Sequence, residues 1–153
     1  ELDGVEALGN VIVIGASNRE DMIDPAILRP GRLDVKIEIS RPGREATADI
    51  FGKYLTPELP LADAELDAHG GDRVATVAAL TGAAVDRIFA HADADRHVSG
   101  AVVRNVVDRA KTAAIKGVVA GAQKGLTRSH LELAADQELA EARAVAAGTL
   151  AGA

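Results

Sequence analysis

One asparagine and two arginines near the start of the chain are of the types that proteins use to handle phosphate. Asn18 follows two residues after the apolar segment 11–16, and Arg29 and Arg32 flank a proline and a glycine. Ligands of open α/β sheets bind beyond the carboxyl ends of the strands, which is where Asn18 is expected. Guanidinium groups stay charged and present a rigid fork of donors to phosphate oxygens. The pattern therefore indicates contacts with a nucleotide.

Each of these residues also has a purely structural explanation. Asn18 tolerates turn geometry well. Arg29 and Arg32 would form a salt bridge to Asp24 or Asp34 within a solvated loop. The residue types alone leave both interpretations open.

The run from Asn18 to Asp34, taken with the apolar segment before it, resembles the second region of homology of AAA+ ATPases. The stretch from Glu1 to Leu55 is most similar to the proteasome-associated branch of that family in actinobacteria, and the stretch from Gly71 to Leu139 is similar to it more loosely. Within this second stretch, the similarity to the family is best over residues 104–111 and 114–116.

The resemblance assigns a role to each of the three residues. Asn18 would be sensor 1, which orients the attacking water near the γ-phosphate. Arg29 and Arg32 would be arginine fingers that reach into the nucleotide site of the neighbouring subunit. A finger of this kind contributes on the order of 10³ to 10⁵ in rate.

Gly100 and Ala101 are the candidate cofactor-binding residues. With Ser99 they open a helix where the lid of the family touches the nucleotide with a Gly-Ala pair. A glycine lets the backbone approach the base and ribose closely. An ordinary capped helix start explains the same residues, and the resemblance favours the nucleotide contact.

The resemblance implies the C-terminal portion of a hexameric, cytoplasmic AAA+ ATPase. Such a chaperone-like unfoldase couples ATP hydrolysis to protein unfolding for proteasomal degradation. Its cofactors would be ATP and Mg²⁺, and its partners would be other copies in the ring, the proteasome core and tagged substrates. The alternative is a non-enzymatic helical interaction module, or a truncated gene remnant, that binds no nucleotide.

The chain departs from the family pattern in several places. It contains no G-x-x-x-x-G-K-[ST] phosphate loop and no acidic Walker B strand. We therefore expect it to be inactive alone, and whether it is itself an enzyme stays open. Val5 replaces an aromatic residue of the intersubunit signalling motif. Little room is left between Asp95 and Ser99 for the family's inserted β-rich segment, and the family's Gly-Gln-Tyr-Leu tail, which docks on the proteasome, is absent.

Composition narrows the classes of partner. The formal net charge of -6 argues against a general nucleic-acid surface, which needs clustered Lys and Arg. No apolar stretch approaches the roughly 20 residues of a membrane span. There is no cysteine, and the four histidines lack the spacing of a metal site. We expect no nucleic-acid or membrane partner and no metal held by this chain alone.

The expected fold is α/β: a partial parallel sheet of a P-loop NTPase core, followed by a small all-α lid. Segment 11–16 is continuously apolar, as in a strand covered on both faces, and segment 35–39 alternates like an edge strand. Because two strands are too few for a stable sheet, we expect further strands upstream.

Helices are predicted over 44–55, over 73 to about 92 behind an Asp72 cap, from a Ser99 cap, and from a Ser129–Glu132 capping box to about 147. Apolar stripes are expected on the second of these (Val74, Val77, Ala78, Ala84, Val85, Ile88) and on the third (Val103, Val106, Val107, Ala110, Ala114). Prolines between 56 and 60 place a boundary there. The predicted parts are the end of the large ATPase subdomain (1–57), a linker (58–71) with a solvated acidic stretch, the lid (72–147) and a flexible tail (148–153).

Overall fold

The structure is a computed structural model that describes residues 12–17, 19, 22–28, 33 and 35–148. The chain divides into two compact units, residues 1–40 and residues 41–153. Asn18, Arg29 and Arg32 lie outside the described residues. Each unit is considered by itself below.

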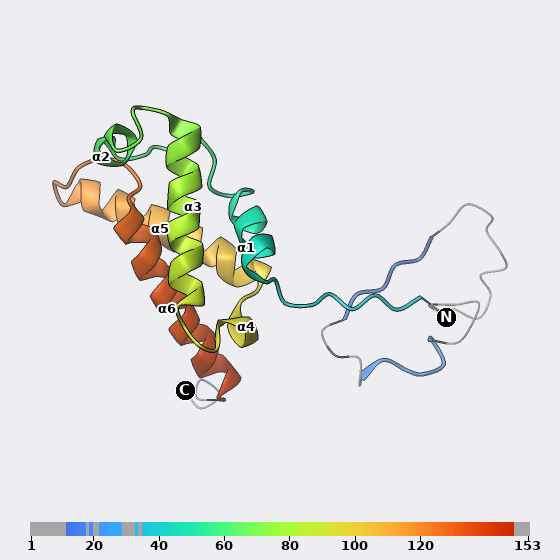
Figure 1. The fold of residues 1–153 in the computed structure, drawn as a ribbon. Coiled ribbons are helices and arrows are strands. Elements are labelled where there is room, and N and C mark those ends of the chain that lie inside the picture. The colour runs from blue at the N-terminus through green and yellow to red at the C-terminus, as the bar shows by residue number, and fades with distance from the viewer. Residues whose placement is uncertain (1–11, 18, 20–21, 29–32, 34, 149–153) are drawn as a thin grey trace. The chain divides into compact units, whose positions relative to one another are not determined.

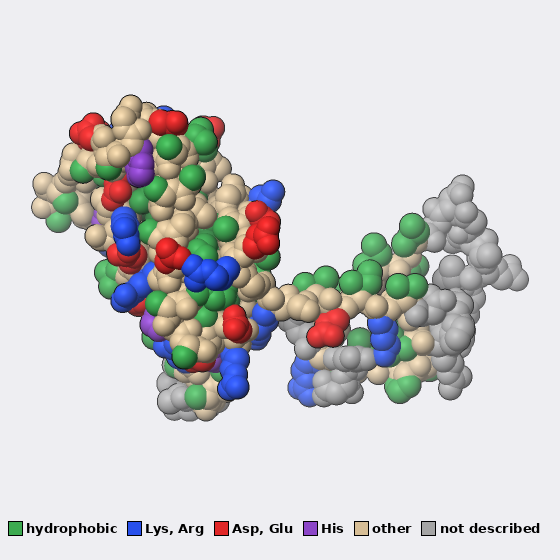
Figure 2. Space-filling model, viewed as in Figure 1, with side chains coloured by type: hydrophobic (Ala, Val, Ile, Leu, Met, Phe, Trp, Pro, Cys, Tyr) green, Lys and Arg blue, Asp and Glu red, His purple; other side chains and the backbone are tan. Residues whose placement is uncertain are grey.

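The described part of the first unit contains no strand, which corrects the expectation of strands at 11–16 and 35–39. The apolar side chains of both segments are exposed, with Ile14 at 87% and Ile39 at 88%. Figure 2 shows these hydrophobic side chains in green along the described part of the unit. A strand forms when its backbone N–H and C=O groups pair with a neighbour. Among the described residues neither segment is part of a strand, so the partial sheet is not shown there.

The second unit is helical (Figure 1). Its helix α6 packs against both α3 and α5, and α1 packs against the same two helices. The short helices α2 and α4 lie against α3, and α4 also contacts α6. The bounds are α1 Arg44–Phe51, α2 Asp63–Asp67, α3 Arg73–Phe89, α4 Ala94–His97, α5 Gly100–Val119 and α6 Arg128–Ala146.

The core of this unit is built from small and aliphatic side chains. The predicted stripe on α5 is confirmed, because all five of its residues are buried. On α3 the prediction was wrong in its first half: Val74 is 66% exposed, Ala78 is also exposed, and Val77 is only partly buried. Thr76 and Leu80 are the buried residues of the first turns. Thr76 fits the core because its hydroxyl donates to the carbonyl of Asp72 at 2.7 Å, which leaves no polar group unsatisfied.

Helix α1 belongs to this core. Phe51 is fully buried and Leu55 is 1% exposed, and both join the same apolar cluster as α3, α5 and α6. The segment after α1 is held as well, because Arg73 donates to the carbonyls of Pro57 and Leu59, each at 2.5 Å. The expected boundary at residue 57 therefore lies inside the second compact unit, which begins at residue 41.

The expected caps of α3 and α5 are confirmed. Asp72 accepts from the amides of Val74 and Ala75, and Ser99 accepts from the amide of Val102. The capping box of the last helix was placed two residues late. Thr127 is the N-cap of α6. Its hydroxyl accepts from the backbone amide of His130, and the His130 ring accepts from the backbone amide of Thr127.

Two features of the 58–71 segment were not foreseen. The acidic stretch forms the short helix α2 instead of a solvated loop, and Glu65 accepts from the amide of Arg128 at the start of α6 at 2.8 Å. Close by, Leu61 and Leu126 form an isolated parallel bridge. The bridge requires Gly125, which has φ +115 and lies so near Leu61 and Ala62 that a Cβ would come within 2.4 Å of their backbone.

Candidate functional site at the start of helix α5

The start of α5 is exposed and has a single side-chain cap. The hydroxyl of Ser99 accepts from the amide of Val102 at 3.3 Å, and the carbonyl of Ser99 accepts from the amide of Val103 at 3.1 Å. Gly100 and Ala101 are both exposed. A Cβ built on Gly100 meets nothing within 4 Å, so packing inside the chain does not require a glycine here. The surface around this turn is open for a ligand to approach the backbone.

The connection that leads into α5 is short and firmly held. Val98 is fully buried, and its carbonyl accepts from the guanidinium of Arg41 at 3.2 Å. Arg143 on α6 donates to both carboxylate oxygens of Asp93, one of them at 2.8 Å, and His97 lies 3.4 Å from the same carboxylate. Hydrogen bonding from Arg143 lowers the pKa of Asp93 below its ordinary value. These contacts fix Ser99 and the first turn of α5.

A second charged cluster joins α3 to α6. Arg87 forms a bidentate pair with Asp136, with distances of 2.7 and 2.6 Å, and the ring of His91 lies 3.1 Å from the same carboxylate. Hydrogen bonds from Arg87 lower the pKa of Asp136, and His91 adds to the effect. The geometry is that of a strong charge-assisted pair.

A third cluster joins α5 to α6. Arg109 lies 2.7 Å from Glu138 and 2.9 Å from Glu141, and Asn105 donates to Glu138 at 3.2 Å. Glu138 is buried, and the hydrogen bond to it raises the pKa of Arg109 above its ordinary value. Because a buried carboxylate needs a partner, this pair sets how α5 and α6 face each other.

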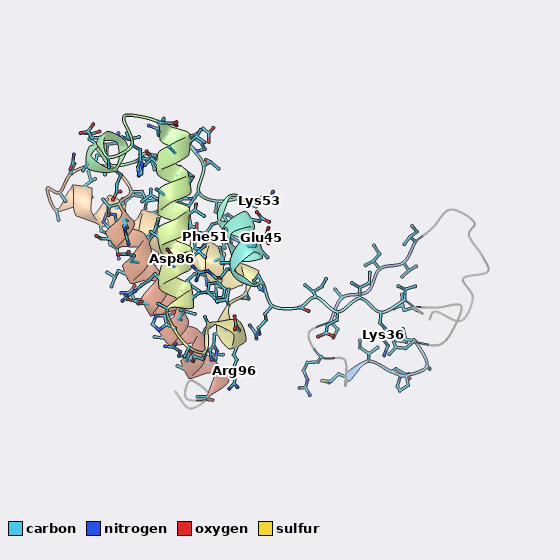
Figure 3. All side chains as sticks on the ribbon, in the orientation of Figure 1. Lys36, Glu45, Phe51, Lys53, Asp86 and Arg96 are labelled. Atoms are coloured by element: carbon cyan, nitrogen blue, oxygen red, sulfur yellow. The ribbon has the colours of Figure 1, made fainter. Side chains whose placement is uncertain are left out.

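A groove of about 450 Å³ lies beside the Ser99 end of α5. One wall is formed by Arg41, by the connection at Arg96 and by the first two turns of α5, and the other by the last turns of α6 from Glu138 onward. Figure 3 labels Arg96, a residue of α4, toward the C-terminal end of α6. The groove was not foreseen from the sequence. Its residues come from four separate segments, and only the packing of α6 on α5 brings them together.

The predicted site residues have different outcomes. Gly100 and Ala101 lie together at the exposed start of α5. Asn18, Arg29 and Arg32 lie outside the described residues, so their roles stay predictions. In the part of the chain that the structure describes, no group of three or more His, Asp or Glu side chains could hold a metal ion. Likewise, none of the helices in that part is both long and apolar enough to cross a membrane.

Two family models match the chain in succession. The model described as ARC, AAA+ ATPase lid domain, matches residues 42–99 and 95–151. The model described as ATPase family associated with various cellular activities (AAA) matches residues 1–41. The junction between the two models coincides with the junction between the two compact units.

Curated relatives agree with the family models. The chain is 54% identical over 159 residues to a protein named proteasome-associated ATPase from Acidothermus cellulolyticus, which covers 92% of this chain and 27% of the relative. Proteins of the same name from Thermobifida fusca and Streptomyces avermitilis are each 53% identical with the same coverage. The chain thus spans about a quarter of the length of these relatives.

Proposed function

Because the chain belongs to the AAA+ ATPases that carry an ARC lid domain, we propose that it is the C-terminal portion of a hexameric ATPase of this type. The intact protein would be a cytoplasmic unfoldase that couples ATP hydrolysis to protein unfolding for proteasomal degradation. The observation that carries the proposal is the order of the two family matches. The AAA model matches the first 41 residues, and the lid model then matches nearly the whole helical unit.

In this function the helical unit is the lid over the nucleotide. Gly100 and Ala101 would contact the base and ribose through the exposed first turn of α5. The absence of any atom near a Cβ on Gly100 supports this role, because the glycine then serves an approach from outside the chain. The Ser99 cap and the held connection before it keep that turn in one conformation, which a contact with a ligand requires.

The first unit would supply the catalytic residues. Asn18 would orient the attacking water as sensor 1. Arg29 and Arg32 would act as arginine fingers on the nucleotide of the neighbouring subunit. The exposed apolar segments 12–16 and 35–39 would then become strands of the partial sheet, paired with strands from the rest of the large subdomain. ATP and Mg²⁺ would be bound by the intact ring, whose partners would be the proteasome core and tagged substrates.

A chimera tests the proposal. Residues 1–153 would replace the matching segment of the Acidothermus cellulolyticus relative, which supplies the phosphate loop. We expect ring assembly and ATP hydrolysis. Arg29→Ala or Arg32→Ala should lower turnover by about 10³-fold or more while nucleotide binding is retained, because a finger acts on the transition state. Arg128→Ala, at an exposed site on α6, is the matched control and should leave turnover unchanged.

Mixed rings separate the roles of the two sites. A finger variant combined with a phosphate-loop variant should regain partial activity, because some sites then contain an intact donor and an intact acceptor. An inactive chimera in a verified ring would contradict the proposal. Absence of rescue in mixed rings would instead give the arginines a local structural role.

The lid contact has its own measurement. Gly100→Val in the chimera should weaken nucleotide affinity without preventing assembly, because the added side chain stands where the base and ribose would approach. The isolated chain should give a flat calorimetric titration with ATP and Mg²⁺, since no phosphate loop occurs in its sequence. Micromolar binding by the isolated chain would require a nucleotide site elsewhere in it.

A further inference from the structure

The segment that begins the helical unit is fixed to both ends of the connection between α3 and α5. At the end of α3, the guanidinium of Arg44 forms an ion pair with Asp86, and its Cζ atom lies 5.4 Å from the centre of the Phe89 ring (Figure 3 labels Asp86). At the start of α5, Arg41 donates to the carbonyl of Val98 at 3.2 Å. One short segment of the chain thus holds the connection at two points.

The bond to Val98 satisfies a polar group that has no access to solvent. Val98 is 0% exposed, so its carbonyl is buried and needs a hydrogen-bond donor. The next residue, Ser99, is the N-cap of α5, and its hydroxyl and carbonyl accept from the amides of Val102 and Val103. Arg41 therefore acts on the residue immediately before the cap of the turn to which we assign the nucleotide contact.

Arg41 also marks the place where the chain passes from one compact unit to the other. It is the first residue of the second unit, and the AAA and lid models meet at residues 41 and 42. The residue after it is anchored in the helical unit, because the carbonyl of Pro42 accepts from the hydroxyl of the fully buried Thr47 at 3.5 Å. A single side chain therefore links this junction to Val98, 57 residues further along the chain.

A second arginine of the unit makes the same kind of bond at a different place. Arg73, the first residue of α3, donates to the carbonyls of Pro57 and Leu59, each at 2.5 Å. Those carbonyls lie in the segment between α1 and α2, and neither belongs to the connection before α5. Comparing the two arginines therefore separates a bond that holds the first turn of α5 from one that holds the unit in general.

From these observations we propose that Arg41 is a positioning residue for nucleotide binding. By holding Val98, it keeps the first turn of α5 in the position from which Gly100 and Ala101 meet the base and ribose. The inference rests on the proposed function and adds to it a residue that touches no nucleotide. A contact with the base and ribose is equally strong in the ground state and the transition state, so weakening it raises KM and leaves kcat unchanged.

Steady-state kinetics of ATP hydrolysis by the chimeric ring test the inference. Arg41→Ala should raise the KM for ATP at least fivefold and change kcat by less than twofold. Arg41→Lys, which keeps a donor for the carbonyl of Val98, should restore most of the affinity. Arg73→Ala is the matched control, and its KM should equal that of the parent ring. Arg41→Ala should add little to the effect of Gly100→Val, because both changes act on the same turn.

Amide hydrogen exchange of the whole chain labelled with ¹⁵N needs no nucleotide and so separates the positioning from the proposed function. Arg41→Ala should lower the protection of the amides of Val102 and Val103 at least fivefold. Arg73→Ala should leave the protection of both amides unchanged. The amide spectrum of each variant verifies its fold before exchange is measured.

Each contrary result has a distinct meaning. Unchanged protection in Arg41→Ala would show that the arginine does not hold the turn. Lowered protection with an unchanged KM would give Arg41 a structural role only. Equal rises in KM for Arg41→Ala and Arg73→Ala would assign the effect to general destabilisation of the helical unit. An inactive parent chimera in a verified ring would overturn the proposed function and the nucleotide part of this inference, while the exchange data would still decide whether Arg41 holds the turn.

Discussion

Arg109 on α5 lies 2.7 Å from the carboxylate of Glu138 on α6, and the side chain of Glu138 is only 7% exposed. Arg109 is 37% exposed, so the pair consists of a buried acid and a partly solvated base. Such a pair is held mainly because its buried member cannot be left without a partner.

Removing the base should therefore destabilise the helical unit. Arg109→Ala leaves the carboxylate of Glu138 with Asn105 alone, and we expect a loss of about 1–3 kcal/mol in the free energy of unfolding. Arg104→Ala, which removes an exposed helix pair, should cost about 0.5 kcal/mol or less. Urea unfolding followed by circular dichroism measures both, and equal losses would contradict the importance of the buried acid.

The apolar face of α5 gives a sharper test of the core. Val107 is fully buried, so Val107→Asp should cost about 4 kcal/mol or more and unfold the unit. Ile115 lies on the same helix but is 67% exposed, and Ile115→Asp should change stability by less than about 0.5 kcal/mol. Thermal melts of the two variants compare the same new side chain at a buried and at an exposed position of one helix. Similar melting temperatures would mean that the faces are wrongly assigned.

Two glycines should respond in opposite directions to alanine. Gly125→Ala should destabilise by about 2–4 kcal/mol, because its φ is +115 and the new Cβ would lie 2.4 Å from backbone atoms of Leu61 and Ala62. Gly82 lies inside α3 with nothing near its Cβ position, so Gly82→Ala should stabilise by about 0.5–1 kcal/mol. Chemical denaturation of both variants checks the sign of each change.

Acid should weaken the links of α6 to its neighbours. The pKa of Asp136 is lowered by Arg87, and the pKa of Asp93 is lowered by Arg143. Because both folded-state values lie below the unfolded ones, the stabilisation is complete above the unfolded pKa of roughly 3.9. It is then lost as the pH falls through the folded values.

The measurement is the free energy of unfolding between pH 6 and pH 2.5. Asp136→Asn should be less stable than the parent chain at pH 6, and the difference should shrink as the pH falls. A difference that stays constant across this range would show that the carboxylate charge is not what holds Arg87. Arg128→Ala, whose partner is Glu132, is a control for the loss of an exposed pair elsewhere on α6.

Local sequence patterns were enough to predict the helices. They were not enough to predict whether the two apolar segments form strands. Asp72 and Ser99 are caps whose effect depends only on the residues that follow, so their positions were correct. The stripe on α5 was correct because α1 and α6 cover one face of that helix. Segments 11–16 and 35–39 have the composition of strands, but a strand depends on a neighbour that local sequence does not supply.

The errors within the helical unit have equally specific causes. Val74 has the correct helical spacing for the core, but Thr76 and Leu80 take the buried positions in the first turns of α3, and Val74 is left exposed. The start of α6 was misplaced because a histidine, His130, completes the capping box in place of the usual acid or amide. The groove at Arg96 required the three-dimensional packing of segments that are far apart in the chain.

Helix α6 is linked to three different helices at successive positions: Asp136 to α3, Glu138 to α5 and Arg143 to the Asp93 beside α4. A slip of α6 along its axis by one turn, about 5.4 Å, would move the carboxylate of Asp136 away from the guanidinium of Arg87. It would also move the guanidinium of Arg143 away from its carboxylate. The position of α6 along its axis is thus set by ion pairs as well as by side-chain packing. Its helices should consequently exchange their amide hydrogens as one cooperative block, with no stepwise release of α6.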